Sequence, residues 1–415
     1  EHAMPVPIQQ QVLTVAERLL DPHVVVAAVT DADAASLTHG LAGTALLHAR
    51  LSFLSPVFAN AADHHWTAAA ARLARNRGAF TGIQGGQGGL AASLIVASVY
   101  LPDPDRYHAA TSRAAAWLAT CARDITARYR HDSPPAWHVY DAITGLTGIG
   151  RVLLAAHQTG HTAVEPGLDA ALTTLTAILA PRNTPLPGWW LPAQQHPTPA
   201  SIHPSGAATT GIAHGVAGPL ALLAIAYHEG WRVPGQADAI EHATHWLLQW
   251  RTDTGQWPPY ITGDELSNNQ RPSTPGRTDA WCYGTPGITR ALHLAARALD
   301  KPDWLHAADN ALKQLAERAP HEWDTDGPTL CHGNAGVMQS TVTTCPTIND
   351  AAATAVAKAF DPEALFGFRH KDHSDTHDYP GLLTGAAGVA LALADHANLP
   401  APDSPIRWDC LLNLT

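Results

Sequence analysis

Two stretches, Ala280-Trp281-Cys282-Tyr283-Gly284-Thr285-Pro286-Gly287 and Leu330-Cys331-His332-Gly333-Asn334-Ala335-Gly336, decide how this sequence is interpreted. Each places cysteine or histidine just before a Gly-x-x-Gly turn that opens an apolar segment. Thiolate sulfur and imidazole nitrogen suit Zn²⁺, so Cys282, Cys331 and His332 are candidate ligands of one zinc ion per chain. A structural zinc normally takes four protein ligands, whereas a catalytic zinc keeps a position open. Three ligands therefore favour a catalytic zinc, although an isolated pair of cysteines is more often simply buried in a core.

The Gly-x-x-Gly turn recurs along the chain at intervals of roughly 45 to 70 residues, a range in which repeat architectures are expected. The seven copies begin at Gly40, Gly85, Gly145, Gly215, Gly284, Gly333 and Gly385. An apolar run follows each turn, and we expect an inner helix there, for example over 44–51, 90–99, 149–156, 220–227 and 389–394. A further helix is predicted over about Gln9–Leu20 from its helical apolar spacing.

Second apolar stripes lie between the turns. Trp117, Cys121 and Ile125 follow one another at i, i+4 and i+8, which indicates an amphipathic helix and makes Cys121 a core residue. Each repeat is thus predicted to be an outer and an inner helix joined through a glycine turn. Glycines let helix starts crowd together at one end, and we expect a closed all-α (α/α) toroid or barrel of about seven helix pairs. Its crowded helix N-termini would favour the thiolate form of the two candidate cysteines. We expect one domain over residues 5–415.

Three intervals depart from the helix-pair pattern. Pro181–Thr210 is rich in Pro, Gly, Ser and Thr and reads as a long loop or small insertion. Thr252–Arg277 is polar and leads directly into the first zinc motif. Phe368–Tyr379 carries His370, His373 and His377, which would suit a second metal site, but a solvated loop is the better interpretation. Long loops in a compact domain are often functional, and at the mouth of the ring these would form a substrate groove.

His214 and Asp141 are candidates for acid–base chemistry. His214 precedes Gly215 as His332 precedes Gly333, so its side chain should face the same central space. A histidine there can donate or accept a proton near neutral pH. His39 has the same register before Gly40 and is a rival. Asp141 lies shortly before the third turn, where an aspartate is also a common turn cap.

Composition narrows the functional classes. Apolar residues make up 46% and charged residues 15% of the 415 residues, so a large core is expected and disorder is not. The net charge of −11 gives no reason to expect nucleic acid as a partner. Five cysteines form no even disulfide framework, which favours a reduced, cytoplasmic compartment. There is no apolar run of about 18 residues and no signal peptide. Glu1-His2-Ala3 before Met4 reads as a cloning remnant.

Trp281-Cys282-Tyr283-Gly284 together with Cys331-His332-Gly333, both on Gly-x-x-Gly repeats, resembles the lanthionine synthetase C-like family of lanthipeptide cyclases. The resemblance extends over about Leu37 to Ala394 and looks like the free-standing cyclase of a class I pathway. It implies an (α/α) toroid with a central zinc held by Cys282, Cys331 and His332. It further implies that a cysteine thiol of a dehydrated precursor peptide, leader plus core, adds to dehydroalanine or dehydrobutyrine, forming a lanthionine or methyllanthionine ring.

The resemblance also implies site roles. His214 matches the family's His-Gly-x-x-Gly histidine and would protonate the enolate, and Asp141 would orient it. The family often carries an arginine shortly before Trp-Cys-Tyr-Gly; here Arg277 lies five residues and Thr278 four residues ahead of Cys282, so Arg277 is the candidate enolate stabiliser with its register shifted. Tyr283 would support a ligand, and 181–210 is the candidate leader-peptide site. A dehydratase and a transporter are possible partners, in a complex that could lie at the membrane surface.

Two other functions fit some of these features. A toroidal zinc enzyme that alkylates thiols with another electrophile, such as an isoprenoid diphosphate, would need clustered cations, and four lysines in the chain argue against it. A non-catalytic zinc-containing scaffold that binds the peptide would keep the metal but would not need His214.

Overall fold

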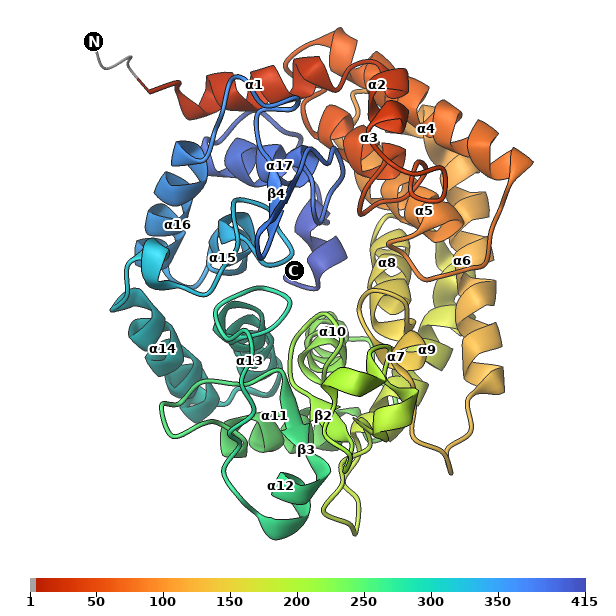
Figure 1. The fold of residues 1–415 in the computed structure, drawn as a ribbon. Coiled ribbons are helices and arrows are strands. Elements are labelled where there is room, and N and C mark those ends of the chain that lie inside the picture. The colour runs from red at the N-terminus through yellow and green to blue at the C-terminus, as the bar shows by residue number, and fades with distance from the viewer. Residues whose placement is uncertain (1–4) are drawn as a thin grey trace.

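The computed structural model describes residues 5–415, so the expectation for Glu1–Met4 lies outside the described residues. Within that range the helices form a closed ring of two layers, with the inner helices side by side around a centre (Figure 1). The predicted helical toroid is therefore confirmed. The inner helices are α3 (Leu41–Arg50), α5 (Gly86–Ala97), α8 (Leu146–Gln158), α10 (Ala217–His228), α13 (Thr285–Leu299), α15 (Asn334–Ser340) and α17 (Ala386–His396).

An outer helix packs against each inner helix. The outer helices are α1 (Ile8–Arg18), α4 (Pro56–Arg75), α6 (His108–Arg128), α9 (Glu165–Leu179), α11 (Gln236–Gln249), α14 (Pro302–Ala316) and α16 (Pro346–Lys358). Their sequences explain the two layers. All residues from Ala217 to Ala226 of α10 are buried, as expected for a helix that is apolar on every face. The outer α14 buries only one stripe and leaves its charged residues outside.

The two ends of the chain complete the ring. The first helix, α1, packs against the last inner helix, α17, and α17 also contacts α3. Arg18 of α1 donates hydrogen bonds to the carbonyls of Ala364 (2.7 Å) and Pro362 (2.8 Å), which lie in the last repeat. At the other end of the chain, the 3₁₀ segment η7 (Trp408–Leu412) contacts α5 and α8 inside the ring, where it is buried (Figure 1).

Backbone hydrogen bonds join six of the seven pairs of neighbouring glycine turns in the described range, and we call these bonds the turn belt. Each joins a backbone amide of one turn to a carbonyl of the next. They run from Leu37 to Gln84, Ala142 to Ala213, Ala213 to Cys282, Cys282 to Cys331, Cys331 to Leu383 and Leu382 to Leu37, with N···O distances between 2.9 and 3.5 Å. Close backbone approach requires glycine. Gly284 has φ +127°, and a Cβ there would lie 2.0 Å from the Thr278 carbonyl oxygen. Several inner helices therefore begin inside the motif, earlier than the apolar runs predict.

All three intervals that are predicted as irregular contain strands. In 181–210, β1 (Trp190–Leu191) and β2 (Ala207–Thr209) pair with β3 (Tyr260–Thr262) of the second interval, in an antiparallel sheet ordered β1-β2-β3. The short helices α2 (Pro22–Ala27), α7 (Trp137–Tyr140) and α12 (Gly263–Asn268) are additions to the helix pairs. The prediction of a solvated loop around the histidine run is wrong for its centre: β4 (His370–Asp372) and β5 (Asp375–His377) form a hairpin.

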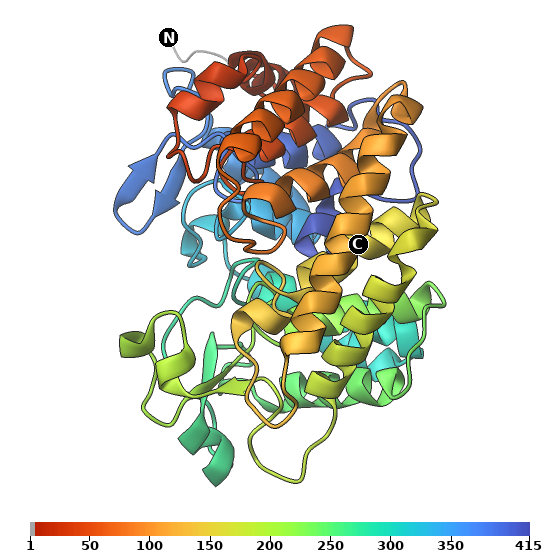
Figure 2. The ribbon, with the colours of Figure 1, turned by 90° about the vertical axis from the view of Figure 1, so that its right-hand side faces the viewer.

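The inserted sheet and the hairpin project from the same end of the ring (Figure 2). This is the end at which the turn belt lies, since both are joined to the turns: the Val216 amide of the fourth turn donates to the Thr209 carbonyl of β2 (3.0 Å), and the Thr329 hydroxyl bonds to His370 of β4 (2.7 Å). The helices of the described range include none long and apolar enough to span a bilayer.

The close packing of the turns predicts an unequal response to two glycine substitutions. In Gly388→Ala the new Cβ would lie 1.9 Å from the Leu382 carbonyl oxygen, so backbone must move. We expect the free energy of unfolding to fall by about 2 to 3 kcal/mol. Gly150→Ala, also in an inner helix, is the matched control because its Cβ meets the mobile end of Leu222 at 2.8 Å. Denaturant unfolding of both variants measures the difference, and equal losses would contradict the role of backbone contact.

Candidate metal and proton-transfer site

Three candidate ligands meet at the turn belt. One donor atom from each of Cys282, Cys331 and His332 lies within 4.8 Å of the other two. Their convergence follows from the repeats. Cys282 and Cys331 hold the same position in neighbouring turns, and the Cys282 amide donates to the Cys331 carbonyl at 3.1 Å. Two soft sulfurs and an imidazole, partly or fully buried at one point, fit a zinc ion chemically.

The two thiols influence each other's ionisation. A hydrogen bond between them, together with burial, raises the pKa of Cys282 well above its ordinary value. The same hydrogen bond lowers the pKa of Cys331, and the positive charge of Arg277 acts in the same direction. The pair therefore releases its first proton readily and holds its second one. A cation is the natural partner for thiolates arranged in this way, because metal binding requires both to be deprotonated.

The hairpin β4–β5 fixes the orientation of His332. Its Nε2 donates to the Lys371 carbonyl oxygen at 3.1 Å. A carbonyl can only accept, so in the neutral ring Nδ1 carries the lone pair that a metal needs. His370 is buried edge-on to His332, with ring centroids 5.0 Å apart. The three histidines of the run do not converge on one point among the described residues; instead, Asp326, Asp372 and His373 form a second, largely exposed group.

Asp141, which is buried, and His214, which is partly exposed, form a hydrogen-bonded pair. His214 Nδ1 lies 2.6 Å from Asp141 Oδ2, and the Asp141 side chain is completely buried. The other carboxylate oxygen, Oδ1, accepts hydrogen bonds from the amides of Ile143, Thr144 and Gly145 at 2.6 to 3.0 Å. Asp141 thus caps its turn with one oxygen and holds the histidine with the other, so its two sequence interpretations are compatible. Because the carboxylate accepts from Nδ1–H, Nε2 is the nitrogen left to exchange a proton.

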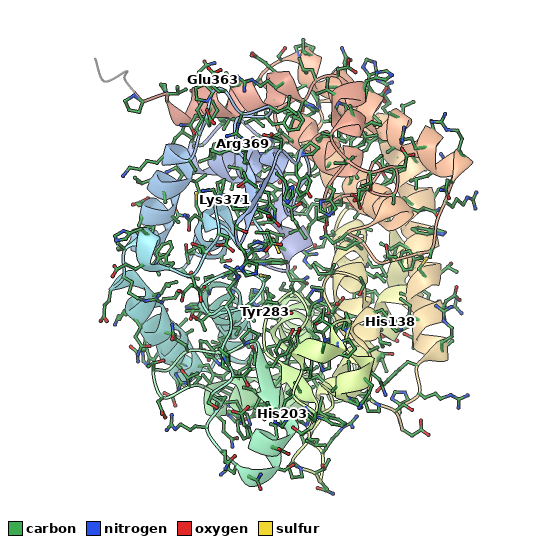
Figure 3. The ribbon with its side chains drawn as sticks, in the orientation of Figure 1. His138, His203, Tyr283, Glu363, Arg369 and Lys371 are labelled. Carbon is green, nitrogen blue, oxygen red and sulfur yellow. The ribbon has the colours of Figure 1, made fainter. Side chains whose placement is uncertain are left out.

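Aromatic side chains lie around His214, next to the candidate metal ligands. Tyr283, next to Cys282 in sequence, lies 6.4 Å from His214 between ring centroids, and its hydroxyl hydrogen-bonds with that of Tyr260 in β3. Figure 3 shows Tyr283 near the centre of the ring, with His138 of α7 further out. Burial raises the pKa of Tyr283 well above its ordinary value, so its phenol stays protonated at neutral pH. The His214 ring is also stacked on the indole of Trp137.

Arg277 lies beside the ligand cluster, whereas Thr278 does not take its place. Arg277 Nη2 donates to Asp326 Oδ2 at 2.8 Å, and its charge reaches Cys331 and His332. The Thr278 amide donates to Asp324 Oδ2 at 2.7 Å. The next residue, Asp279, is buried, and its carboxylate accepts hydrogen bonds from both terminal nitrogens of Arg318, each at 2.7 Å. This bidentate pair holds the segment that leads into Cys282.

His39, the rival of His214, is engaged at another point of the ring. Its Nδ1 bonds to the Thr384 hydroxyl at 2.8 Å, and its ring lies edge-on to Tyr379. Sequence reasoning missed Trp137, the Lys371 carbonyl and the Asp279–Arg318 pair. For Trp137 a signal was present, since it precedes Asp141 by four residues and one helical turn places such residues on the same side. A backbone carbonyl acting on a histidine leaves no mark in a sequence.

Comparison with known proteins agrees with this fold. A solved structure of nisin cyclase shares the fold, with a TM-score of 0.78 at 19% identity over 98% of this chain and 96% of that chain. The nisin biosynthesis protein NisC of Lactococcus lactis subsp. lactis is 26% identical over 207 residues. That match covers 48% of each protein, so the chain spans about half the length of this curated relative. The family model of lanthionine synthetase C-like proteins matches residues 31–409. The chain therefore belongs to the lanthionine synthetase C-like family.

Proposed function

We propose that the protein is a zinc-dependent lanthipeptide cyclase. It joins a cysteine thiol of a dehydrated precursor peptide to the β-carbon of a dehydroalanine or dehydrobutyrine, forming a lanthionine or methyllanthionine ring. The observation that carries this proposal is that a candidate metal-ligand set and a candidate proton donor lie together at one end of the ring. A soft ligand set, Cys282, Cys331 and His332, is linked through Tyr283 to the Asp141–His214 pair. Family membership and the names of the relatives, nisin cyclase and NisC, support the same reaction.

The metal is proposed to be one Zn²⁺ per chain, held by Cys282, Cys331 and His332. When bound, zinc supplies a Lewis acid that lowers the pKa of a substrate thiol. The residues around it keep the ligands in place. The Lys371 carbonyl holds the Nε2–H form of His332, and the turn belt bond keeps the two cysteines adjacent. Burial of Cys282 and partial burial of Cys331 limit competition from water.

Proton transfer is proposed for His214. As the thiolate sulfur bonds to the β-carbon, the electrons of the carbon–carbon double bond move towards the neighbouring carbonyl oxygen as an enolate. The enolate then takes a proton at its α-carbon, which completes the thioether. His214 Nε2–H can deliver this proton, since Asp141 occupies Nδ1 and stabilises the protonated ring. Arg277 is placed beside the ligands, where its positive charge would stabilise the enolate oxygen.

The compartment, the precursor and the partner proteins are further parts of this proposal. We propose a cytoplasmic site of action on a precursor with leader and core segments, with a dehydratase and a transporter as partners. The 181–210 interval remains our candidate for leader binding, because with β3 it forms a sheet at the end of the ring that carries the candidate site.

Replacing one ligand tests the metal and the reaction together. For the wild type we expect about one zinc per chain, measured by plasma mass spectrometry. On a dehydrated precursor, free thiols should disappear; they are counted by alkylation, because cyclisation leaves the peptide mass unchanged. Cys282→Ala should lose both zinc and thiol consumption, whereas the control Cys345→Ala, at the start of α16, should keep both. Stoichiometric zinc without thiol consumption would favour a non-catalytic scaffold, and folded protein without zinc would refute the mechanism.

Removing the proposed acid should separate chemistry from metal binding. We expect His214→Asn to lower kcat for ring formation by about 10²- to 10⁴-fold, the usual contribution of a positioned general acid. Zinc content should remain that of the wild type. His138→Asn is the control, because His138 lies on α7 but is exposed, and its kcat should be unchanged. Single-turnover assays on the dehydrated precursor measure both variants. Full activity in His214→Asn would assign the proton to another group.

A further inference from the structure

We propose that Trp137 is a positioning residue for His214 and that the inserted sheet holds Trp137 in place. This inference rests on the proposed function, because it concerns the histidine assigned there to proton delivery. The indole of Trp137 lies flat on the imidazole of His214, with centroids 4.2 Å apart and an interplanar angle of 11°. This flat stacking contact constrains the plane of the His214 imidazole.

Trp137 and Asp141 act on the histidine from one short helix. Trp137 opens α7, and the Asp141 amide that follows this helix donates to the Trp137 carbonyl at 2.9 Å. The Asp141 carboxylate fixes the direction of Nδ1, but the imidazole could still tilt about that single hydrogen bond. The stacked indole removes this freedom and covers one face of the ring. Together the two contacts aim Nε2, and the His214 side chain keeps 26% exposure for a substrate.

The indole is in turn held by the inserted sheet. His196, which follows β1, is buried and stands edge-on to Trp137 at 5.7 Å and 87°. His196 is also edge-on to Tyr260 of β3, at 5.9 Å and 85°. Tyr260 contacts Tyr283 at 6.1 Å, and Tyr283 contacts His214 at 6.4 Å. These five side chains, His214, Trp137, His196, Tyr260 and Tyr283, close on themselves, and we call them the aromatic circuit.

Through the aromatic circuit, side chains from the two intervals that form the inserted sheet become part of the surroundings of His214. Two of its five members come from the intervals 181–210 and 252–277, which supply no metal ligand and no proton donor. The sheet holds both members: Tyr260 packs against the minor core of Ala193, Ile202 and Ala207, and His196 Nε2 hydrogen-bonds to the Leu191 carbonyl of β1 at 3.2 Å. The sheet is therefore connected to the orientation of His214 through ring contacts rather than through the backbone of the turns alone.

A double-mutant cycle tests the inference in the zinc-loaded full-length protein. Stacked aromatic pairs are worth about 2- to 12-fold in an equilibrium or rate, so Trp137→Leu should lower kcat by about three- to tenfold with KM unchanged. Trp137→Phe, which retains a ring, should recover most of the loss. In a His214→Asn background Trp137→Leu should have no further effect, because its action passes through that histidine. Trp117→Leu is the control, since Trp117 stands edge-on to Phe80 on the outer helix α6.

Each result decides between the alternatives. An equal fold-loss from Trp137→Leu in both backgrounds, or a raised KM with unchanged kcat, would overturn the positioning role. If Trp137→Leu does not fold, as judged by zinc content and thermal unfolding, His196→Ala replaces it, with a loss of about twofold in kcat expected only when His214 is present. A His214→Asn variant with normal kcat would overturn the proposed function of His214 itself, and that outcome is distinct from additivity in the cycle.

Discussion

The site depends on the hydrogen bond from the Cys282 amide to the Cys331 carbonyl. This bond is one member of the turn belt, and it brings together two residues that are far apart in sequence but equivalent in their repeats. Similar bonds on either side connect Ala213 to Cys282 and Cys331 to Leu383. The helices behind the turns are buried on nearly every face, so a shift of one turn would disturb its neighbours. Placement of the ligands is therefore a property of the whole ring.

The same constraint places the proposed proton-transfer pair near the candidate metal ligands. Asp141 belongs to the third turn, His214 to the fourth, and the two cysteines to the fifth and sixth. Because the third to sixth turns are bonded in succession, candidate residues from four repeats share one end of the ring without any loop having to reach across it. In sequence, the strands of the inserted sheet flank the fourth turn, which carries His214, and precede the fifth, which carries Cys282.

Much of this arrangement could be predicted from sequence, because the glycine turns and the residues just before them recur in every repeat. The register of His332, His214 and the two cysteines against their glycines was enough to place them together, and the apolar runs were enough for the helical toroid. Three kinds of feature could not be predicted. The inserted strands are only two or three residues long, too short for an alternating pattern. Lys371 acts through its carbonyl, and Asp279–Arg318 pairs residues 39 apart. The inner helices begin earlier than the apolar runs predict, because Gly and Ala residues of the turns already belong to the helices.

Closure of the ring by α1 has a consequence for how the protein is made. The outer helix of the last repeat, α1, precedes the other ring helices of the described range in sequence, whereas its partner α17 is made after every other inner helix. Until then the nascent chain is an open arc, with the apolar flank of its first repeat uncovered. The ring thus closes by the pairing of α1 with α17 rather than by the addition of one more unit. The turns that carry the candidate ligands precede α17 in sequence, so the ring around them closes only after they have been made.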